Sequence, residues 1–200
     1  MNVRPHAARL PAARRRQQLL DVALHVFGDQ GFHPASMNDV ADAAGVTKPV
    51  LYQHFRSKRD LYREVLTDVG DRLLDAITKA TAAATSPHEQ VELGFAAYFS
   101  WVSTNEPAFR VLFGGGTRRD EEFAAQVAKV EAAIAEAIAV LIDVEGLEDA
   151  QRRQLANGLV GLAEGTSRLW MAEGAEGPPE DVARLVADLA WRGLRGIRGA

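Results

Sequence analysis

The chain has 200 residues, of which 47% are hydrophobic, so it can bury a core in one large or two small domains. It contains no cysteine, which excludes disulfide bonds and thiolate metal sites. Its net charge of −4 is unevenly spread: residues 1–62 carry nine Lys and Arg against five Asp and Glu, whereas residues 63–200 carry fourteen against twenty-two. The N-terminal part can therefore attract phosphate groups, while the acidic remainder limits indiscriminate binding.

Residues 1–12 are rich in Pro, Ala and Arg and show no helical periodicity, so we expect a flexible basic arm there. These arginines are not followed by the apolar core of a signal peptide. No apolar run approaches the ~20 residues that span a bilayer. The sequence therefore predicts a cytoplasmic protein that makes no contact with a membrane.

From residue 13 to residue 30, apolar side chains recur at spacings of three and four, as in an amphipathic helix that ends at Gly31. They are Leu19, Leu20, Ala23, Leu24 and Phe27. The pattern predicts a packed helix without a catalytic group.

Residues 36–58 predict two short helices joined by a tight turn of three or four residues. Ser36 and Asp39 have the spacing of a capping box, in which a hydroxyl and a carboxylate each satisfy a backbone N–H at the helix start. Gly45 can adopt the positive φ that the turn needs. Thr47 followed by Pro49 is typical of the start of a second helix, where Thr47 would be the cap.

The second helix would bury Leu51 and Phe55, four residues apart. Its exposed side then carries cations, an amide, a phenol and an imidazole together with a proline. These residues are Lys48, Pro49, Tyr52, Gln53, His54 and Arg56. An α-helix fits the DNA major groove, where such groups can meet phosphates and base edges. We therefore predict a helix-turn-helix DNA-binding unit.

This stretch resembles the DNA-binding domain of TetR-type transcriptional regulators. In that family an Ala-Gly-Val turn, a Leu-Tyr pair, a His or Tyr before an aromatic or aliphatic residue, and a later lysine recur in this order. The matching residues are Ala44, Gly45, Val46, Leu51, Tyr52, His54, Phe55 and Lys58, and the resemblance covers about residues 14–66. It implies a homodimer whose two reading helices enter successive major grooves of a palindromic operator, about 34 to 36 Å apart.

Carried over by position, the resemblance implies base-facing and phosphate-facing residues. The base-facing positions are Asn38, Lys48, Pro49, Val50 and Tyr52, and the phosphate-facing positions are Thr47, Gln53, His54 and Lys58. Asn38 and Val50 replace a longer basic residue and a threonine of some members, so the bases read here cannot be copied from a relative. The arginines at 14–16 either contact DNA or belong to a solvated tail.

Ser57 and Asp60 repeat the capping-box spacing and open a long helix from Lys58 to about residue 83. A lysine at a helix N-terminus makes a good anion site, so Lys58 is the leading candidate for a phosphate contact. The rest of this helix would connect the DNA-binding unit to everything downstream.

A further helix is expected from residue 86 to residue 104, with a short one after Asn105. Their many aromatic side chains either pack in a core or form one wall of an apolar ligand cavity. The three glycines at 114–116 predict a flexible, hinge-like break, because they lack the strand and the Lys-Ser or Lys-Thr pair of a phosphate-binding loop.

Three more helices are expected, at about residues 118–144, 148–173 and 179–197. The family resemblance implies that the last two pack against their twins in a four-helix dimer interface. Glycine in a helix costs up to ~1 kcal/mol, and close packing of another backbone would offset that cost. Gly158, Gly161 and Gly165 are placed to permit such packing.

A polar helix face includes Asn157, Glu164 and Arg168, which either form a solvated surface or orient the polar end of a ligand. The candidate ligand-binding residues are Phe95, Tyr98, Phe99, Val102, Phe109, Phe113, Val127, Ile134, Asn157 and Arg168. The segments TKPVLYQHFRSK, FRVLF and NGLVGLAEG resemble actinobacterial TetR-type regulators of fatty-acid synthesis, which implies long-chain acyl-CoA as a candidate effector. A drug, a terpenoid or a flavonoid would suit the same apolar walls.

We therefore predict an all-α protein of about nine helices, with the arm at 1–12, a three-helix helix-turn-helix DNA-binding domain at 13–60 and a helical ligand-binding and dimerisation domain at 61–200. The five histidines show no metal-ligand spacing, and no HExxH or GxSxG motif is present, so we expect neither an enzyme nor a bound metal or cofactor. The predicted function is a transcriptional regulator, by default a repressor, that responds to a small apolar ligand. Two alternatives are a DNA-binding dimer without an effector and a helical protein that only binds small molecules.

Overall fold

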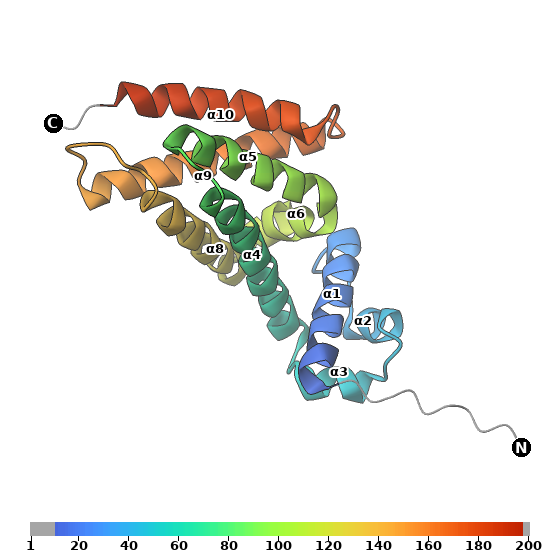
Figure 1. Cartoon of the computed structure of the whole chain (residues 1–200). Coiled ribbons are helices and arrows are strands. Elements are labelled where there is room, and N and C mark those ends of the chain that lie inside the picture. The colour runs from blue at the N-terminus through green and yellow to red at the C-terminus, as the bar shows by residue number, and fades with distance from the viewer. Residues whose placement is uncertain (1–10, 198–200) are drawn as a thin grey trace, which may run out of the picture.

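The structure is a computed structural model that describes residues 11–197, and these residues form ten α-helices and no strand (Figure 1). The helices are α1 (Ala12–Gln30), α2 (Met37–Ala43), α3 (Lys48–His54), α4 (Lys58–Ala82), α5 (Pro87–Thr104), α6 (Glu106–Phe113), α7 (Gly115–Arg119), α8 (Glu121–Ala139), α9 (Asp149–Ala172) and α10 (Pro179–Gly196). The predicted all-α class is confirmed. Most of the predicted N-terminal arm, residues 1–10, lies outside the described residues.

Helices α1 to α3 form a small unit at one end of the molecule, which we call the head (residues 12–54) (Figure 1). Ser36 and Asp39 make the predicted reciprocal capping box at the start of α2. Gly45 has a φ of +63° in the turn between α2 and α3. Leu51 and Phe55 are fully buried, so α3 is held by one side and presents the other to solvent.

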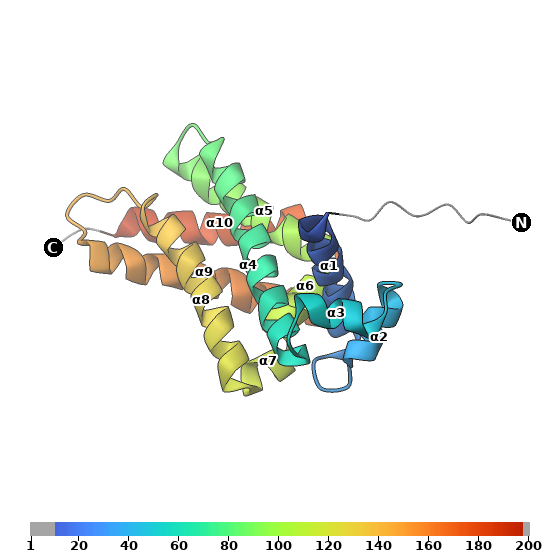
Figure 2. The ribbon, with the colours of Figure 1, turned by 90° about the horizontal axis from the view of Figure 1, so that it is seen from below.

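Helix α4 leads from the head into a bundle formed by α5 to α10, which we call the body (residues 87–196) (Figures 1 and 2). Ser57 caps α4 by accepting from the Asp60 N–H at 3.0 Å. The Asp60 carboxylate accepts from the Arg56 N–H and not from the N–H of Ser57, so the predicted capping box is displaced by one residue. Because α4 starts at Lys58, it crosses the boundary that we expected after residue 60.

The glycines at 114–116 do not form the flexible break that the sequence predicted. Gly115 and Gly116 belong to the first turn of the short helix α7. The reason is the next residue, Thr117, whose buried hydroxyl donates to the carbonyl of Val111 at 2.8 Å and folds the segment back on α6. Asp120 then caps α8, so the helix predicted from residue 118 begins at Glu121 and ends at Ala139.

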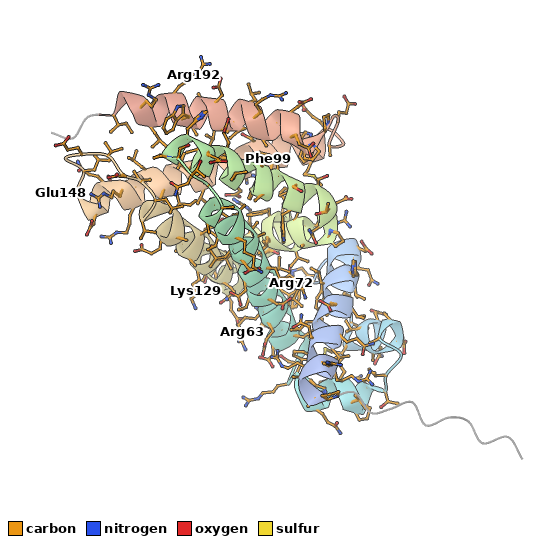
Figure 3. The ribbon with its side chains drawn as sticks, viewed as in Figure 1. Arg63, Arg72, Phe99, Lys129, Glu148 and Arg192 are labelled. Carbon is orange, nitrogen blue, oxygen red and sulfur yellow. The ribbon has the colours of Figure 1, made fainter. Side chains whose placement is uncertain are left out.

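Two joints hold the head against the body. In the first, a Cβ at Gly28 of α1 would lie 2.7 Å from the Pro107 Cβ, and Arg110 of α6 donates to the Gly28 carbonyl and to Asp29, each at 2.8 Å. The second joint lies along α4, where Arg72 pairs with Asp21 of α1 (Figure 3). Nearer the start of α4, Arg63 lies 3.4 Å from Glu122 of α8. The head is therefore positioned by the body on both sides.

No helix among residues 11–197 combines the length and the apolar content that crossing a membrane would need.

Candidate DNA-binding surface and ligand cavity

The exposed side of α3 brings most of the predicted DNA-binding residues together. Thr47, Lys48, Pro49, Tyr52 and Gln53 are exposed, and Val50 and His54 are half-buried at its flanks. The Lys48 ammonium lies 6.0 Å from the centre of the Tyr52 ring, and Tyr52 is 44% exposed although it is a large aromatic residue. Asn38 is exposed in the first turn of α2. Thr47 is the N-cap residue of α3, as predicted, but its side chain makes no capping hydrogen bond.

The packing behind α3 explains why this side of the helix is exposed. Arg16 of α1 stacks its guanidinium 5.0 Å above the buried ring of Phe55 and pairs with Glu64 of α4. Arg15 donates to Gln18 at 2.8 Å, whereas Arg14 is exposed. Of the three arginines at 14–16, Arg14 therefore keeps the most freedom to meet a phosphate.

Lys58, the predicted leading phosphate contact, makes three hydrogen bonds to backbone carbonyls. Its ammonium donates to the carbonyls of Phe32 and Ala35 at 2.8 Å and of His33 at 3.1 Å. An ammonium has three N–H donors, and these three bonds use all of them. Lys58 therefore joins the loop after α1 to the start of α4 in the DNA-free chain, and its phosphate contact stays a prediction.

A cavity of about 360 Å³ lies between α4 and the body helices α5, α8, α9 and α10, within the range of small-molecule sites. Its walls are mainly aliphatic and aromatic. The side chains include Leu73 and Ile77 of α4, Val91 and Phe95 of α5, Val130 and Ile138 of α8, Leu159 and Val160 of α9, and Trp191 and Leu194 of α10. Such walls suit an apolar molecule.

Five of the ten predicted ligand-binding residues line this cavity, namely Phe95, Tyr98, Phe113, Val127 and Ile134. The other five do not. Phe99, Val102 and Phe109 are buried in the core, where Phe99 packs edge-on against the Trp170 ring at 6.1 Å between centroids (Figure 3). They lie elsewhere because the aromatic run covers more than one helix face, and only one face meets the cavity.

The two polar candidates on α9 do not line the cavity. Asn157 is exposed, and its side-chain amide donates to the Arg153 carbonyl one turn back at 2.9 Å. Arg168 is exposed and lies 3.6 Å from Glu164 one turn earlier in α9, as expected of the solvated surface. Glu164 itself lines the cavity.

Two ionisable side chains of the cavity have a raised pKa, and the sequence reading named the first, Tyr98, but missed the second, Glu131. Burial raises the pKa of Tyr98 to about 12, while the Ser167 hydroxyl, 2.9 Å away, opposes that rise. Glu131 of α8 lines the cavity, and burial raises the pKa of its carboxyl. A signal was present, because Glu131 follows Val127 by four residues and precedes Ile134 by three, within an otherwise apolar stripe.

One face of α9 and α10 is apolar and exposed. Leu169, Leu185 and Leu189 are 60%, 72% and 62% exposed. At Gly158, Gly161 and Gly165, an added Cβ would meet nothing within 4 Å. The glycines therefore leave space on this face that no other part of the described chain fills.

A helix-turn-helix with an exposed second helix, carried on a separate helical bundle, defines a DNA-binding protein of the helix-turn-helix class. Residues 19–65 match the tetR family of bacterial regulatory proteins, and residues 87–193 match the tetracycline-repressor-like C-terminal domain. The chain therefore belongs to the TetR family of transcriptional regulators.

Individual relatives agree with this membership. The HTH-type transcriptional activator FasR of Mycolicibacterium smegmatis is 35% identical over 187 residues, which are 93% of this chain and 85% of FasR. The HTH-type transcriptional repressor KstR2 of the same species is 39% identical over 87 residues, 44% of this chain and 42% of KstR2.

Solved structures show the same fold. A TetR-like transcriptional regulator from Rhodococcus sp. RHA1 has a TM-score of 0.75 at 32% identity, over 94% of this chain and all of that one. The regulator FadR of Bacillus subtilis, solved in complex with stearoyl-CoA, has a TM-score of 0.75 at 17% identity, over 91% of this chain and 99% of FadR. At that identity the likeness to FadR is one of fold alone.

Proposed function

We propose that this chain forms a homodimer that binds a palindromic operator through α3 and the start of α2, and that an apolar small molecule in the body modulates that binding. One observation carries the proposal. The helix that enters the head at Lys58 also supplies Leu73, Ile77 and Thr81 to the cavity wall. An occupant of the cavity therefore touches the element that positions the DNA-binding surface, and its differential affinity for two arrangements would shift their balance.

The dimer is supported by the exposed apolar face of α9 and α10. A second copy that covers Leu185, Leu189 and the glycines of α9 would bury these leucines and let the backbones approach closely. Operator binding with two-fold symmetry needs such a pair of heads.

A long acyl chain is the effector class that we propose. The cavity walls are mainly aliphatic and aromatic, and the charged residues that line it are Arg195 and the acidic Glu131, Asp143 and Glu164. The B. subtilis regulator FadR, which shares this fold, was solved in complex with stearoyl-CoA. Long-chain acyl-CoA would combine an apolar tail for the cavity with an anionic end for a cation.

The test begins with selection of operator sequences from random duplexes by the purified protein, followed by fluorescence anisotropy with the selected operator. Palmitoyl-CoA is then titrated into the protein and into the complex. A ligand at a hundred times its dissociation constant adds about 2.7 kcal/mol to the free energy of unfolding, which a thermal melt detects. Operator affinity should change over the same concentration range.

A matched pair of variants locates the effector. Ile134→Trp would fill the cavity and should abolish the thermal shift, whereas Ala132→Trp on the exposed side of α8 should keep it. Failure to select any operator contradicts the DNA-binding part of the proposal. An operator with no response to palmitoyl-CoA contradicts the acyl effector and leaves a DNA-binding dimer without that input.

For the sign of regulation we propose repression, because a dimer bound over a promoter obstructs polymerase and because KstR2 is a named repressor. FasR, which matches far more of the chain, is a named activator, so activation is the second candidate. A promoter fusion with and without the chain distinguishes them, since repression lowers reporter output and activation raises it.

A further inference from the structure

Four charged side chains lie at one side of the cavity, where Glu131 and Glu164 line it and the exposed Arg118 and Arg168 lie against Glu164, and we call them the wall cluster. They are Glu131 of α8, Glu164 and Arg168 of α9, and Arg118 of α7. Arg118 forms an ion pair with Glu164, and the positive charges of Arg118 and Arg168 partly offset the rise that burial causes in the pKa of Glu131. Removing one partner of such a group leaves the others uncompensated, so the cluster acts as a unit.

Arg118 belongs to α7, a helix of only five residues. The side chain of the residue before it, Thr117, points the other way, into the core. The Thr117 hydroxyl is buried and donates to the Val111 carbonyl at 2.8 Å. That leaves the Tyr62 hydroxyl of α4 to donate to Thr117 at 2.5 Å. Two adjacent residues therefore link the cavity wall to α4, only one turn from its start.

The next residues add a second link to α4. Asp120 accepts two hydrogen bonds from the Arg59 guanidinium, at 2.8 and 3.0 Å, and Arg59 also donates to Glu122 at 2.9 Å. The guanidinium of Arg59 lowers the pKa of Asp120. Arg59 and Tyr62 both belong to the first turns of α4, which follow α3 in the chain, and Figure 2 shows α7 near this end of α4 and the start of α8.

We propose that α7 is the relay between the cavity and the head, and that Arg118 is its positioning residue. An occupant that changes the ion pair between Glu164 and Arg118 moves α7. Thr117 and Asp120 transmit that movement to the start of α4 through their hydrogen bonds with Tyr62 and Arg59. The proposal rests on the proposed function and adds its route. An apolar route also exists, because Leu73 and Ile77 of α4 touch the cavity directly, so the test must separate the two.

The test is a double-mutant cycle on operator affinity without any effector. Operator dissociation constants are measured for the wild type, Glu164→Gln, Tyr62→Phe and the double variant. If α7 connects the two sites, each single change shifts the constant by roughly two- to thirtyfold, and the double variant shifts it no more than the larger single change. Glu136→Gln and Arg119→Gln alter exposed side chains of α8 and α7 and should leave the constant unchanged.

Fold changes that simply multiply in the double variant, or single changes without effect, would overturn the relay. Thermal melts verify that each variant is folded, and Arg118→Gln replaces Glu164→Gln in the cycle if the latter is not. These outcomes need no ligand, so they stand apart from the acyl effector of the proposed function.

A second measurement uses palmitoyl-CoA where the wild type binds it. Its effect on operator affinity in the wild type, expressed as a ratio of dissociation constants, should fall towards one in Arg118→Gln while palmitoyl-CoA still binds. An unchanged ratio, or loss of palmitoyl-CoA binding itself, would contradict the role of Arg118 as a positioning residue. Failure of the wild type to bind palmitoyl-CoA bears only on the effector class.

Discussion

Single residues decide how the head is built, and Lys58 is the clearest case. Lys58→Met keeps the side-chain stem but leaves three carbonyls without their donor, so we expect a loss of about 1 to 3 kcal/mol in the free energy of unfolding, measured with urea. Lys129→Met on the exposed side of α8 is the control and should be neutral (Figure 3). If Lys58→Met instead lowers the salt slope of operator binding by about one and leaves the stability unchanged, Lys58 is a phosphate ligand.

Tyr98 gives the stability of the body a predictable dependence on alkaline pH. Its pKa is about 12 in the folded chain against an ordinary 10.0, so the unfolded chain loses the proton first as pH rises. The stability that Tyr98 contributes is complete below pH 10 and is lost towards pH 12, by at most about 1.4 kcal/mol per pH unit. Urea unfolding of Tyr98→Phe should lack this loss. A constant difference between the two proteins up to pH 12 would contradict the prediction.

At the scale of elements, the joint between α1 and α6 leaves no room for a side chain. Gly28→Ala would place a Cβ 2.7 Å from that of Pro107, so α1 must move away from α6. We expect a loss of about 1 to 3 kcal/mol in the free energy of unfolding, together with a changed operator affinity. The control is Gly115→Ala at the exposed start of α7, where a Cβ also meets nothing within 4 Å. Equal melting temperatures for the two variants would show that the joint tolerates the methyl group.

Features that depend on neighbours in sequence were predicted well, whereas contacts between residues far apart in sequence were missed. The capping box of Ser36 and the turn at Gly45 rest on neighbours in sequence, and both were found. The partners of Lys58 lie 23 to 26 residues away, so no spacing rule could identify them. Periodicity likewise marked α5 as apolar without telling which face meets the cavity, and Phe99 was placed on the wrong one.

For the whole molecule, the exposed leucines of α10 should decide whether two heads act together. Leu185→Glu combined with Leu189→Glu would place charges in the proposed dimer interface and should yield a monomer in analytical ultracentrifugation. Operator affinity should fall by about a hundredfold, because a single head loses the benefit of linkage. Val140→Glu, at a site 77% exposed and away from this face, is the control. A dimer that persists in the double variant would place the interface elsewhere.

Because α4 both lines the cavity and adjoins the head, it limits how this protein can be redesigned as a biosensor. Leu73 and Ile77 shape the cavity, but they belong to the helix that carries Arg59 and Tyr62 beside the head, so substitutions there alter effector preference and DNA output together. Trp191 and Leu194 of α10 and Ile138 of α8 border the same cavity from helices outside the head. A library that seeks new effectors with the output preserved should vary these positions and leave α4 as it is.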